Sequence, residues 1–134
     1  MNPNALFADT FYFLALLNGG DQHHAAATRY DAALPSLLTT AWVLTEVGDA
    51  LSAPENRPAF LGLLELLQKT SDVQIIPPST ELFERGVELY RQRADKDWSL
   101  TDCISFVVMA DEKISEALTG DQHFEQAGFR ALLK

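Results

Sequence analysis

Three things are scarce in this sequence: cysteine, positive charge and long apolar runs. The single cysteine, Cys103, cannot form a disulfide within the chain, which fits a reducing cytoplasm. The longest unbroken apolar run covers residues 11–17, far short of the roughly 20 apolar residues that a membrane helix needs. The amino-terminal region also has no basic segment ahead of an apolar one. We therefore expect a cytoplasmic protein without a signal peptide or a membrane span.

Positive charge is scarce, since the chain has 10 Lys and Arg residues and 19 Asp and Glu residues, which gives a net charge of −9. A protein that holds duplex nucleic acid by charge alone would be basic, so the composition excludes that class. It does not exclude a nuclease, because clustered catalytic acids raise the negative count. An acidic protein also attracts a basic partner.

Four basic residues on one predicted helix form the densest basic strip of the chain. This strip either guides a nucleic-acid backbone or is a solvated helix face. Its members are Arg85, Arg91, Arg93 and Lys96.

The spacing of cysteine and histidine argues against a zinc site. His23 and His24 are adjacent and do not face the same way on a helix, and no Cys/His spacing resembles a zinc site. We expect surface histidines, with His123 close enough to Asp121 to contact a substrate. Cys103 lies in a strongly apolar segment, which favours a core residue over a nucleophile.

The pattern of apolar residues and helix breakers predicts one α/β domain over residues 1–134. Strands are predicted at about 4–9, 36–40, 73–76, 114–119 and 129–133. Helices are predicted at about 10–18, 22–33, 41–52, 59–69, 80–94, 99–112 and 121–127. Strands that alternate with helices indicate a parallel sheet covered on both faces. The expected fold is therefore a three-layer α/β/α sandwich with a central sheet of about five strands.

Acidic residues recur where an apolar stretch ends and a helix begins. Asp9 follows residues 5–8, Asp102 lies in the first turn of a predicted helix, and Asp121 follows the predicted strand 114–119. The carboxyl ends of parallel strands and the helix starts after them face one crevice. Carboxylates gathered there repel one another unless a hard cation lies between them, and Mg²⁺ or Mn²⁺ prefers oxygen ligands. The pattern indicates a metal-dependent site for phosphate chemistry.

Each of these acids also has a purely structural explanation. Ser99 and Asp102 fit a capping box, in which each residue hydrogen-bonds the backbone amide of the other. Asp9 and Asp121 fit the N-cap position of the helices that follow them. Taken singly, each acid favours a structural role.

Glu46 is the natural fourth member of the acidic set. It lies on the predicted helix 41–52 among mostly apolar neighbours, and its alternative role is part of a solvated helix face. The predicted helix 99–112 is apolar almost all round, so an uncompensated charge at Asp102 would be costly. The recurrence of acids at one edge favours a metal site over separate helix caps.

Four segments, in order along residues 5 to 133, carry a family resemblance. They are Phe7-Ala8-Asp9-Thr10, Thr45-Glu46-Val47, Trp98-Ser99-Leu100-Thr101-Asp102-Cys103, and Thr119-Gly120-Asp121-Gln122-His123-Phe124 with Ala127-Gly128-Phe129. With these segments the sequence resembles PIN domains, in particular the VapC-like ribonuclease toxins of prokaryotic toxin–antitoxin pairs. The family fold is a small parallel α/β/α sandwich, which agrees with the fold expected from the pattern of elements.

The resemblance implies a site and a chemistry. The acidic metal pocket would consist of Asp9, Glu46, Asp102 and Asp121. The hydroxyl residues that would support it are Thr10, Ser99 and Thr101. Mg²⁺ or Mn²⁺ held there would assist hydrolysis of RNA to a 5′-phosphate and a 3′-hydroxyl. Gly120 stands just before Asp121, where relatives vary, so the resemblance leaves open whether Asp121 would bind the ion directly or through a water molecule.

The resemblance also implies partners. A small antitoxin would wrap the protein with its carboxyl-terminal segment and place a basic residue in the acidic pocket. A homodimer would form through the apolar helices at 10–18 and 59–67, whose alternative role is to pack on the sheet.

Other functions remain open or fail on their motifs. A noncatalytic PIN-like module that binds RNA or protein, and a solitary RNA-processing nuclease without an antitoxin, both stay open. A haloacid-dehalogenase-like phosphatase needs a second Asp two residues after Asp9, where Phe11 stands. A receiver-type domain needs paired acids near the first strand and a phosphoacceptor Asp after a later strand, and the predicted strand 73–76 ends instead in two prolines.

Overall fold

A computed structural model describes residues 4–134 and contains a five-stranded, all-parallel sheet over this range. The strands are β1 (Leu6–Ala8), β2 (Leu37–Thr40), β3 (Val73–Ile76), β4 (Glu116–Leu118) and β5 (Arg130–Ala131). Their order across the sheet is β3-β2-β1-β4-β5. Residues 1–3, which the sequence includes in the predicted domain, lie outside the described residues.

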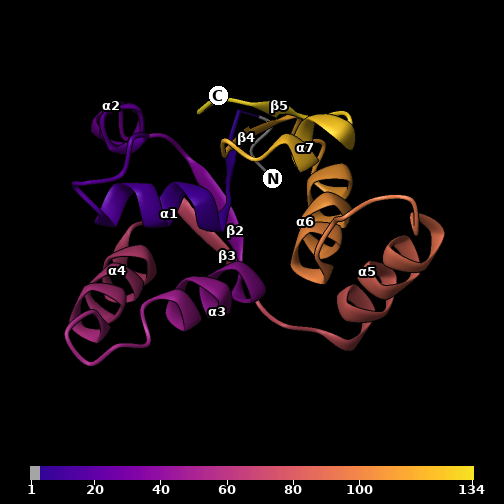
Figure 1. Ribbon diagram of the computed structural model, residues 1–134, viewed down its shortest axis with the longest axis horizontal. Coiled ribbons are helices and arrows are strands. Elements are labelled where there is room, and N and C mark those ends of the chain that lie inside the picture. Colours follow the sequence, from indigo (N-terminus) through magenta and orange to yellow (C-terminus); the bar gives the residue numbers. More distant parts are fainter. Residues whose placement is uncertain (1–3) are drawn as a thin grey trace.

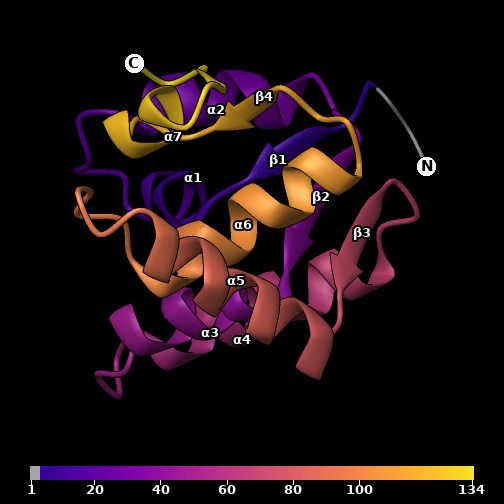
Figure 2. The ribbon, with the colours of Figure 1, turned by 90° about the vertical axis from the view of Figure 1, so that its right-hand side faces the viewer.

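Helices cover both faces of this sheet (Figure 1). They are α1 (Thr10–Leu17), α2 (His24–Ala32), α3 (Ala41–Ala50), α4 (Arg57–Lys69), α5 (Thr80–Gln92), α6 (Leu100–Asp111) and α7 (Gln122–Gln126). α1, α2 and α4 lie on one side, and α5 and α6 on the other (Figure 1). Figure 2, seen from the side of α5, shows α5 and α6 crossing in front of the sheet. The predicted three-layer α/β/α fold is confirmed.

The two central strands are buried because helices cover them on both faces. All four residues of β2 are buried, as are Phe7 and Ala8 of β1. Phe7 pairs with Leu38 on one side and with Ala117 on the other. This register aligns the carboxyl ends of β1, β2 and β4, so the residues that follow these strands meet at one edge of the sheet.

Helix α6 forms the centre of the second helical layer and begins with the predicted capping box. Ser99 Oγ accepts from the Asp102 amide at 3.0 Å, and the Ser99 amide donates to Asp102 Oδ2 at 3.1 Å. Cys103 is fully buried, and burial raises the pKa of its thiol to about 11. The prediction that Cys103 is a core residue is confirmed.

Element ends differ from the predictions by a few residues, and local contacts explain the differences. The predicted helix 99–112 begins one residue later because Ser99 is its N-cap. The predicted strand 129–133 shortens to Arg130–Ala131 because β5 lies at the edge of the sheet and pairs with β4 alone. None of the helices over residues 4–134 is long and apolar enough to span a membrane.

Helices α5 and α6 approach closely at Gly86. A Cβ atom added there would lie 2.3 Å from Ile104 Cγ1.

We therefore expect Gly86→Ala to lower the free energy of unfolding by about 1–3 kcal/mol, because overpacking displaces side chain and backbone. Urea denaturation monitored by circular dichroism measures this change. The matched control is Gly62→Ala in α4, where an added Cβ meets nothing within 4 Å and alanine favours the helix. Equal stability of the two variants would contradict the close packing.

Candidate active site at the carboxyl edge of the sheet

Asp9 follows β1 directly and is buried, with an exposed fraction of 5%. It occupies the N-cap position of α1, and its Oδ2 accepts a hydrogen bond from Thr119 Oγ1 at 2.9 Å. Burial raises the pKa of Asp9 from 3.8 to about 7, against the opposing effect of the Thr119 hydrogen bond. The negative charges of Asp102 and Glu46 raise it further. The Asp9 carboxylate therefore lacks the positive charge that would stabilise its ionised form.

Asp102 lies in the first turn of α6, close enough to Asp9 and Asp121 for its charge to interact with theirs. Burial raises the pKa of the Asp102 carboxyl, and the negative charge of Asp121 raises it further. Hydrogen bonds from the Ser99 amide and from His123 lower this pKa and so oppose the effect of burial. The capping explanation for Asp102 is correct as a description of its backbone contacts. Capping alone does not explain why the buried Asp102 carboxylate lies close to other acidic side chains.

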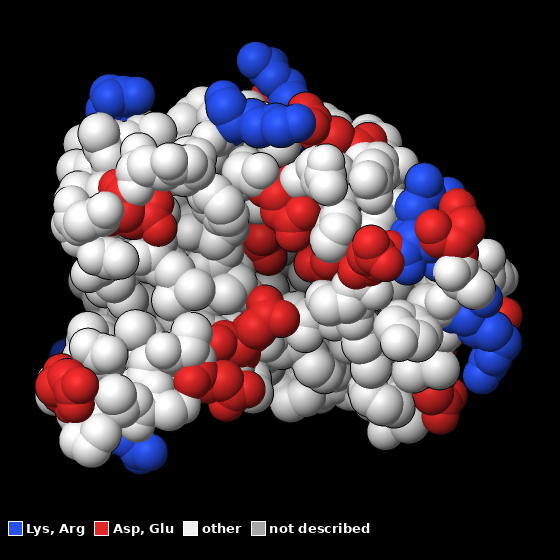
Figure 3. Space-filling view, in the orientation of Figure 1, with Lys and Arg blue, Asp and Glu red and all other residues white. Residues whose placement is uncertain are grey.

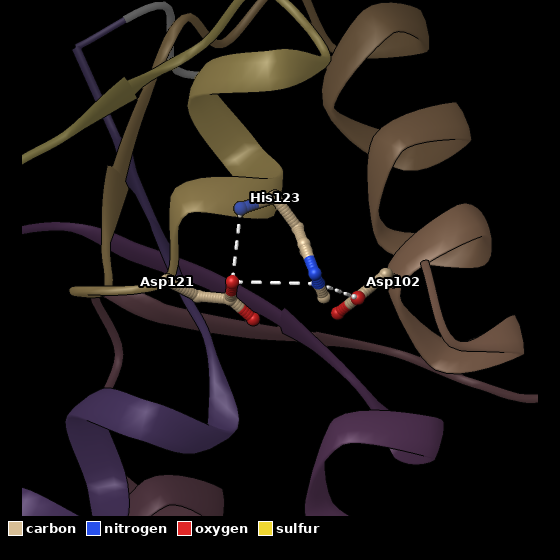
Figure 4. Close-up of side chains that lie close together, drawn as sticks. All are labelled: Asp102, Asp121 and His123. Atoms are coloured by element: carbon tan, nitrogen blue, oxygen red, sulfur yellow. Dashed lines mark hydrogen bonds and ion pairs between the residues drawn. The ribbon is translucent and has the colours of Figure 1, made fainter. Parts of the chain in front are cut away.

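Asp121 and His123 complete a group of three close side chains at the start of α7 (Figure 4). Asp121 caps α7, with its Oδ1 accepting from the His123 amide at 2.9 Å. His123 Nδ1 lies 3.0 Å from Asp102 Oδ2 and 3.4 Å from Asp121 Oδ1. One ligand atom from each of these three residues lies within 4.8 Å of the others, so the structure brings together two of the four predicted acids and a histidine.

Glu46 reaches the same edge of the sheet from α3. It is half-buried, and its Oε1 accepts a hydrogen bond from Thr10 Oγ1 at 2.5 Å. Its charge acts on Asp9, although Glu46 stands outside the close group of Asp102, Asp121 and His123. The predicted supporting residue Thr10 therefore contacts Glu46.

Sequence reasoning gave Thr119 no role and left His123 as a possible substrate contact. Thr119 is fully buried and links two of the acids, because its Oγ1 donates to Asp9 and accepts from the Asp121 amide at 3.1 Å. The only signal in the sequence was that both residues belong to the segment 119–124. Of the remaining predicted supporters, Ser99 caps α6, and the Thr101 carbonyl accepts from Ser105 Oγ.

Gly120 separates Thr119 from Asp121 for a steric reason. A Cβ atom at this position would lie 2.5 Å from the ring of Phe11. The glycine therefore lets α1 pack against the turn that carries Asp121, and Asp121 lies close enough to Asp102 and His123 to share an ion with them.

The electrostatics of this edge fit a divalent cation. Acidic side chains gather around a hollow in the middle of the face shown in Figure 3. Two carboxylates and an imidazole each bring a ligand atom within 4.8 Å of the others. The carboxylate oxygens suit Mg²⁺ and Mn²⁺, whereas an imidazole nitrogen suits transition metals such as Fe²⁺ and Zn²⁺. A cation would also supply the positive charge that the buried Asp9 carboxylate needs.

Residues 6–130 match the family model of the PIN domain. The chain belongs to the PIN domain family. This PIN domain is 30% identical over 125 residues to the 23S rRNA-specific endonuclease VapC20 of Mycobacterium tuberculosis, covering 92% of this chain and 95% of that protein. The family predicted from the four segments is thereby confirmed.

Two solved structures resemble this PIN domain. The crystal structure of M. tuberculosis VapC20, described as a Sarcin-Ricin loop cleaving toxin, matches with a TM-score of 0.84 at 28% identity, over 93% of this chain and 96% of that one. FitAcB from Neisseria gonorrhoeae matches with a TM-score of 0.65 at 14% identity, over 94% of this chain and 95% of that one. The second likeness concerns the fold alone.

The pKa of Asp9 predicts how stability changes with pH in metal-free protein. Between its ordinary pKa of 3.8 and its folded value of about 7, the folded state holds a proton at Asp9 that the unfolded state has released. The contribution of the protonated Asp9 to the free energy of unfolding is therefore lost as pH rises from about 4 to about 7. At about 1.4 kcal/mol per pKa unit, the loss amounts to a few kcal/mol. We expect Asp9→Asn, which needs no proton, to melt several degrees above wild type at pH 8 in EDTA.

Melting curves at pH 4 and pH 8 measure this effect. At pH 4 the two proteins should melt alike, because Asp9 is then protonated. The control is Asp72→Asn, the same change at an exposed acid just before β3, at the opposite edge of the sheet. A pH-independent difference between wild type and Asp9→Asn would contradict a raised pKa at Asp9.

Proposed function

We propose that residues 1–134 form a single PIN-like nuclease domain that hydrolyses RNA with the help of Mg²⁺ or Mn²⁺, and that this domain is the toxin of a toxin–antitoxin pair. One observation carries the proposal: Asp9, Asp102 and Asp121 lie at one edge of the sheet, two of them buried, with Glu46 beside them. The similarity to an endonuclease that is named for cleaving ribosomal RNA supports RNA as the substrate.

Asp102, Asp121 and His123 would hold the ion, with Asp9 and Glu46 beside them. When bound, a divalent cation neutralises charge on the phosphate and makes a water molecule more acidic. His123 is an addition to the four acids expected from the sequence. Its Nδ1 lies between Asp102 and Asp121, so it either ligates the ion or turns aside when the ion enters.

Apart from His123, which lies against Asp102 and Asp121, the hydrogen-bond donors around these acids orient the carboxylates without neutralising them. The Thr119 hydroxyl holds Asp9, the Ser99 amide holds Asp102, and the Thr10 hydroxyl holds Glu46. Neutral hydrogen-bond donors keep the negative charge available to a cation, whereas a lysine or arginine would compete with it. This arrangement suits a site whose acids must be ionised, fixed and open to a metal.

The proposed partners follow from the charge of the site and the exposed surface. An antitoxin that inserts a basic residue would neutralise the same acids that bind the ion, in the cytoplasm where we place the protein. For a homodimer, α4 offers Leu61 and Leu66, whose exposed fractions are 60% and 61%. In α1, by contrast, Tyr12 and Phe13 are buried in the core, so this helix packs on the sheet.

The experiment that tests the function is RNA cleavage by purified protein, with Mg²⁺ or Mn²⁺ against EDTA. The 23S rRNA named for VapC20 is the first substrate to try, beside transfer and messenger RNA. Metal-dependent cleavage supports the nuclease. Binding without cleavage over this panel, and without metal uptake in calorimetry, would instead favour the noncatalytic module. Cleavage that no co-encoded partner inhibits would favour a solitary processing nuclease.

We expect Asp102→Asn to lose at least about 100-fold in cleavage rate, since even residues that only support metal ligands cost 10–100-fold when removed. The asparagine keeps the shape of the capping box, so the melting temperature should stay near that of wild type. Asp72→Asn is the matched control and should cleave normally. Full activity in Asp102→Asn would remove Asp102 from the site.

We expect Thr119→Val to weaken Mn²⁺ binding by about 10–100-fold. In the wild type, the hydrogen bond from the Thr119 hydroxyl lowers the pKa of Asp9. Removing this hydroxyl raises the pKa, so more of the Asp9 carboxyl stays protonated at neutral pH. Isothermal titration calorimetry at pH 7 and pH 8.5 measures the effect, and the deficit should shrink at the higher pH. The same deficit at both pH values would show that Thr119 acts by packing alone.

A further inference from the structure

A second pocket, of about 740 Å³, lies between the carboxyl-terminal half of α5 and the start of α6. Three of its lining residues are cations, Arg91, Arg93 and Lys96, and one is an acid, Asp97. Glu88 and Asp95 pair with these cations, so the pocket gathers basic side chains whose acidic partners lie beside it. Figure 3 shows basic side chains, mixed with acidic ones, along the side of the molecule where Figure 1 places α5.

The second pocket and the acidic site share the start of α6. Trp98 and Cys103 line the pocket, while the residues between them form the capping box that holds the Asp102 carboxylate. Asp102 and Cys103 are neighbours in the chain, so their Cα atoms lie about 3.8 Å apart. The pocket therefore lies at the same end of α6 as Asp102.

The cations of the pocket are held in place but weakly neutralised. Arg93 lies over the ring of Trp98 at 4.9 Å from its centroid, and the indole N–H of Trp98 donates to Gln126 at 3.0 Å. Trp98 is buried, so it gives Arg93 a fixed support, and a preorganised guanidinium loses less entropy when it binds a phosphate.

The acidic partners of these cations are exposed and exchangeable. Arg91 pairs with Glu88, and both Arg93 and Lys96 pair with Asp95. Exposed ion pairs of this kind contribute about 0–1 kcal/mol. A phosphate that enters the pocket therefore displaces these carboxylates from the basic side chains at little cost in free energy.

The pocket also offers a surface for a base. Tyr90 lines it with an exposed fraction of 52%. Proteins that bind single strands combine positive charge along the backbone with aromatic rings on which bases stack. The acidic site repels a polyanion until a metal binds, so an anchor beside it has a clear electrostatic use.

We propose that this pocket binds the RNA strand on one side of the bond that is cut, with backbone phosphates on Arg91, Arg93 and Lys96 and a base on Tyr90. This inference rests on the proposed function and extends it from the site of hydrolysis to a neighbouring substrate subsite.

The test measures RNA binding without cleavage. Asp102→Asn serves as the parent, and a labelled 12-nucleotide single-stranded RNA is titrated in Mg²⁺ at several salt concentrations. The pocket variant adds Arg91→Gln and Lys96→Gln, both at ion pairs whose loss leaves the core intact. The control adds Arg57→Gln and Lys69→Gln, which remove the same charge from α4 on the other side of the sheet. Melting temperatures confirm that all three proteins fold.

We expect the pocket variant to bind about tenfold more weakly, with the slope of log K against log salt reduced by about 1.4, or roughly 0.7 for each lost phosphate contact. The control should stay within about twofold of the parent. Tyr90→Leu should weaken binding with no change in the salt slope, because stacking releases no counterions.

Three results would overturn the subsite. Equal losses in the pocket variant and the control would show a general effect of charge. An unchanged affinity in the pocket variant, with loss of binding to a poly-glutamate peptide, would assign the pocket to an acidic protein partner. Failure of the parent to bind RNA would remove the subsite altogether. The proposed nuclease is judged separately, by metal-dependent cleavage with the wild-type protein.

Discussion

The parallel pairing of β1 with β4 is the constraint on which the site depends. Ala8 pairs with Leu118, so the residues that follow them, Asp9 and Thr119, emerge side by side. The Thr119 hydroxyl then bonds Asp9 and receives the Asp121 amide. A shift of one residue in this pairing would displace Asp9 by about 3.3 Å along the strand direction, so the register fixes its contact with Thr119.

Burial and charge oppose each other at this edge, and the opposition links stability to function. Two acids, Asp9 and Asp102, are buried where burial disfavours their ionised forms. Hydrogen bonds from hydroxyl and amide groups reduce this cost without cancelling the charge. A bound cation would offset the remaining cost of burying these charges. The electrostatic repulsion that destabilises the metal-free fold therefore favours metal binding. A site of this kind is stable enough to fold and remains charged enough to bind an ion.

The start of α6 joins the two parts of the molecule that we assign to RNA. Its capping box directs Asp102 into the acidic edge, while Trp98, just before the cap, supports Arg93 in the neighbouring basic pocket. Close packing of α5 against α6 at Gly86 keeps these basic residues beside the site. Three of the ten Lys and Arg residues thereby lie in the pocket where the proposed polyanionic substrate would meet them.

The order of strands and helices and the α/β class followed from the sequence, because hydrophobic periodicity, helix caps and turn residues act over short stretches of chain. The sequence also named Asp9, Glu46, Asp102 and Asp121 as candidate site residues, from their place beside apolar segments and from the family resemblance. Periodicity could not show that Asp102 contacts His123, or that Thr119 donates a hydrogen bond to Asp9, 110 residues away in the chain. The sequence by itself determined which residues carry charge and at which end of each element they lie. Only the tertiary structure decided which of them meet, because strand register and the packing of α6 bring together side chains that no local interaction connects.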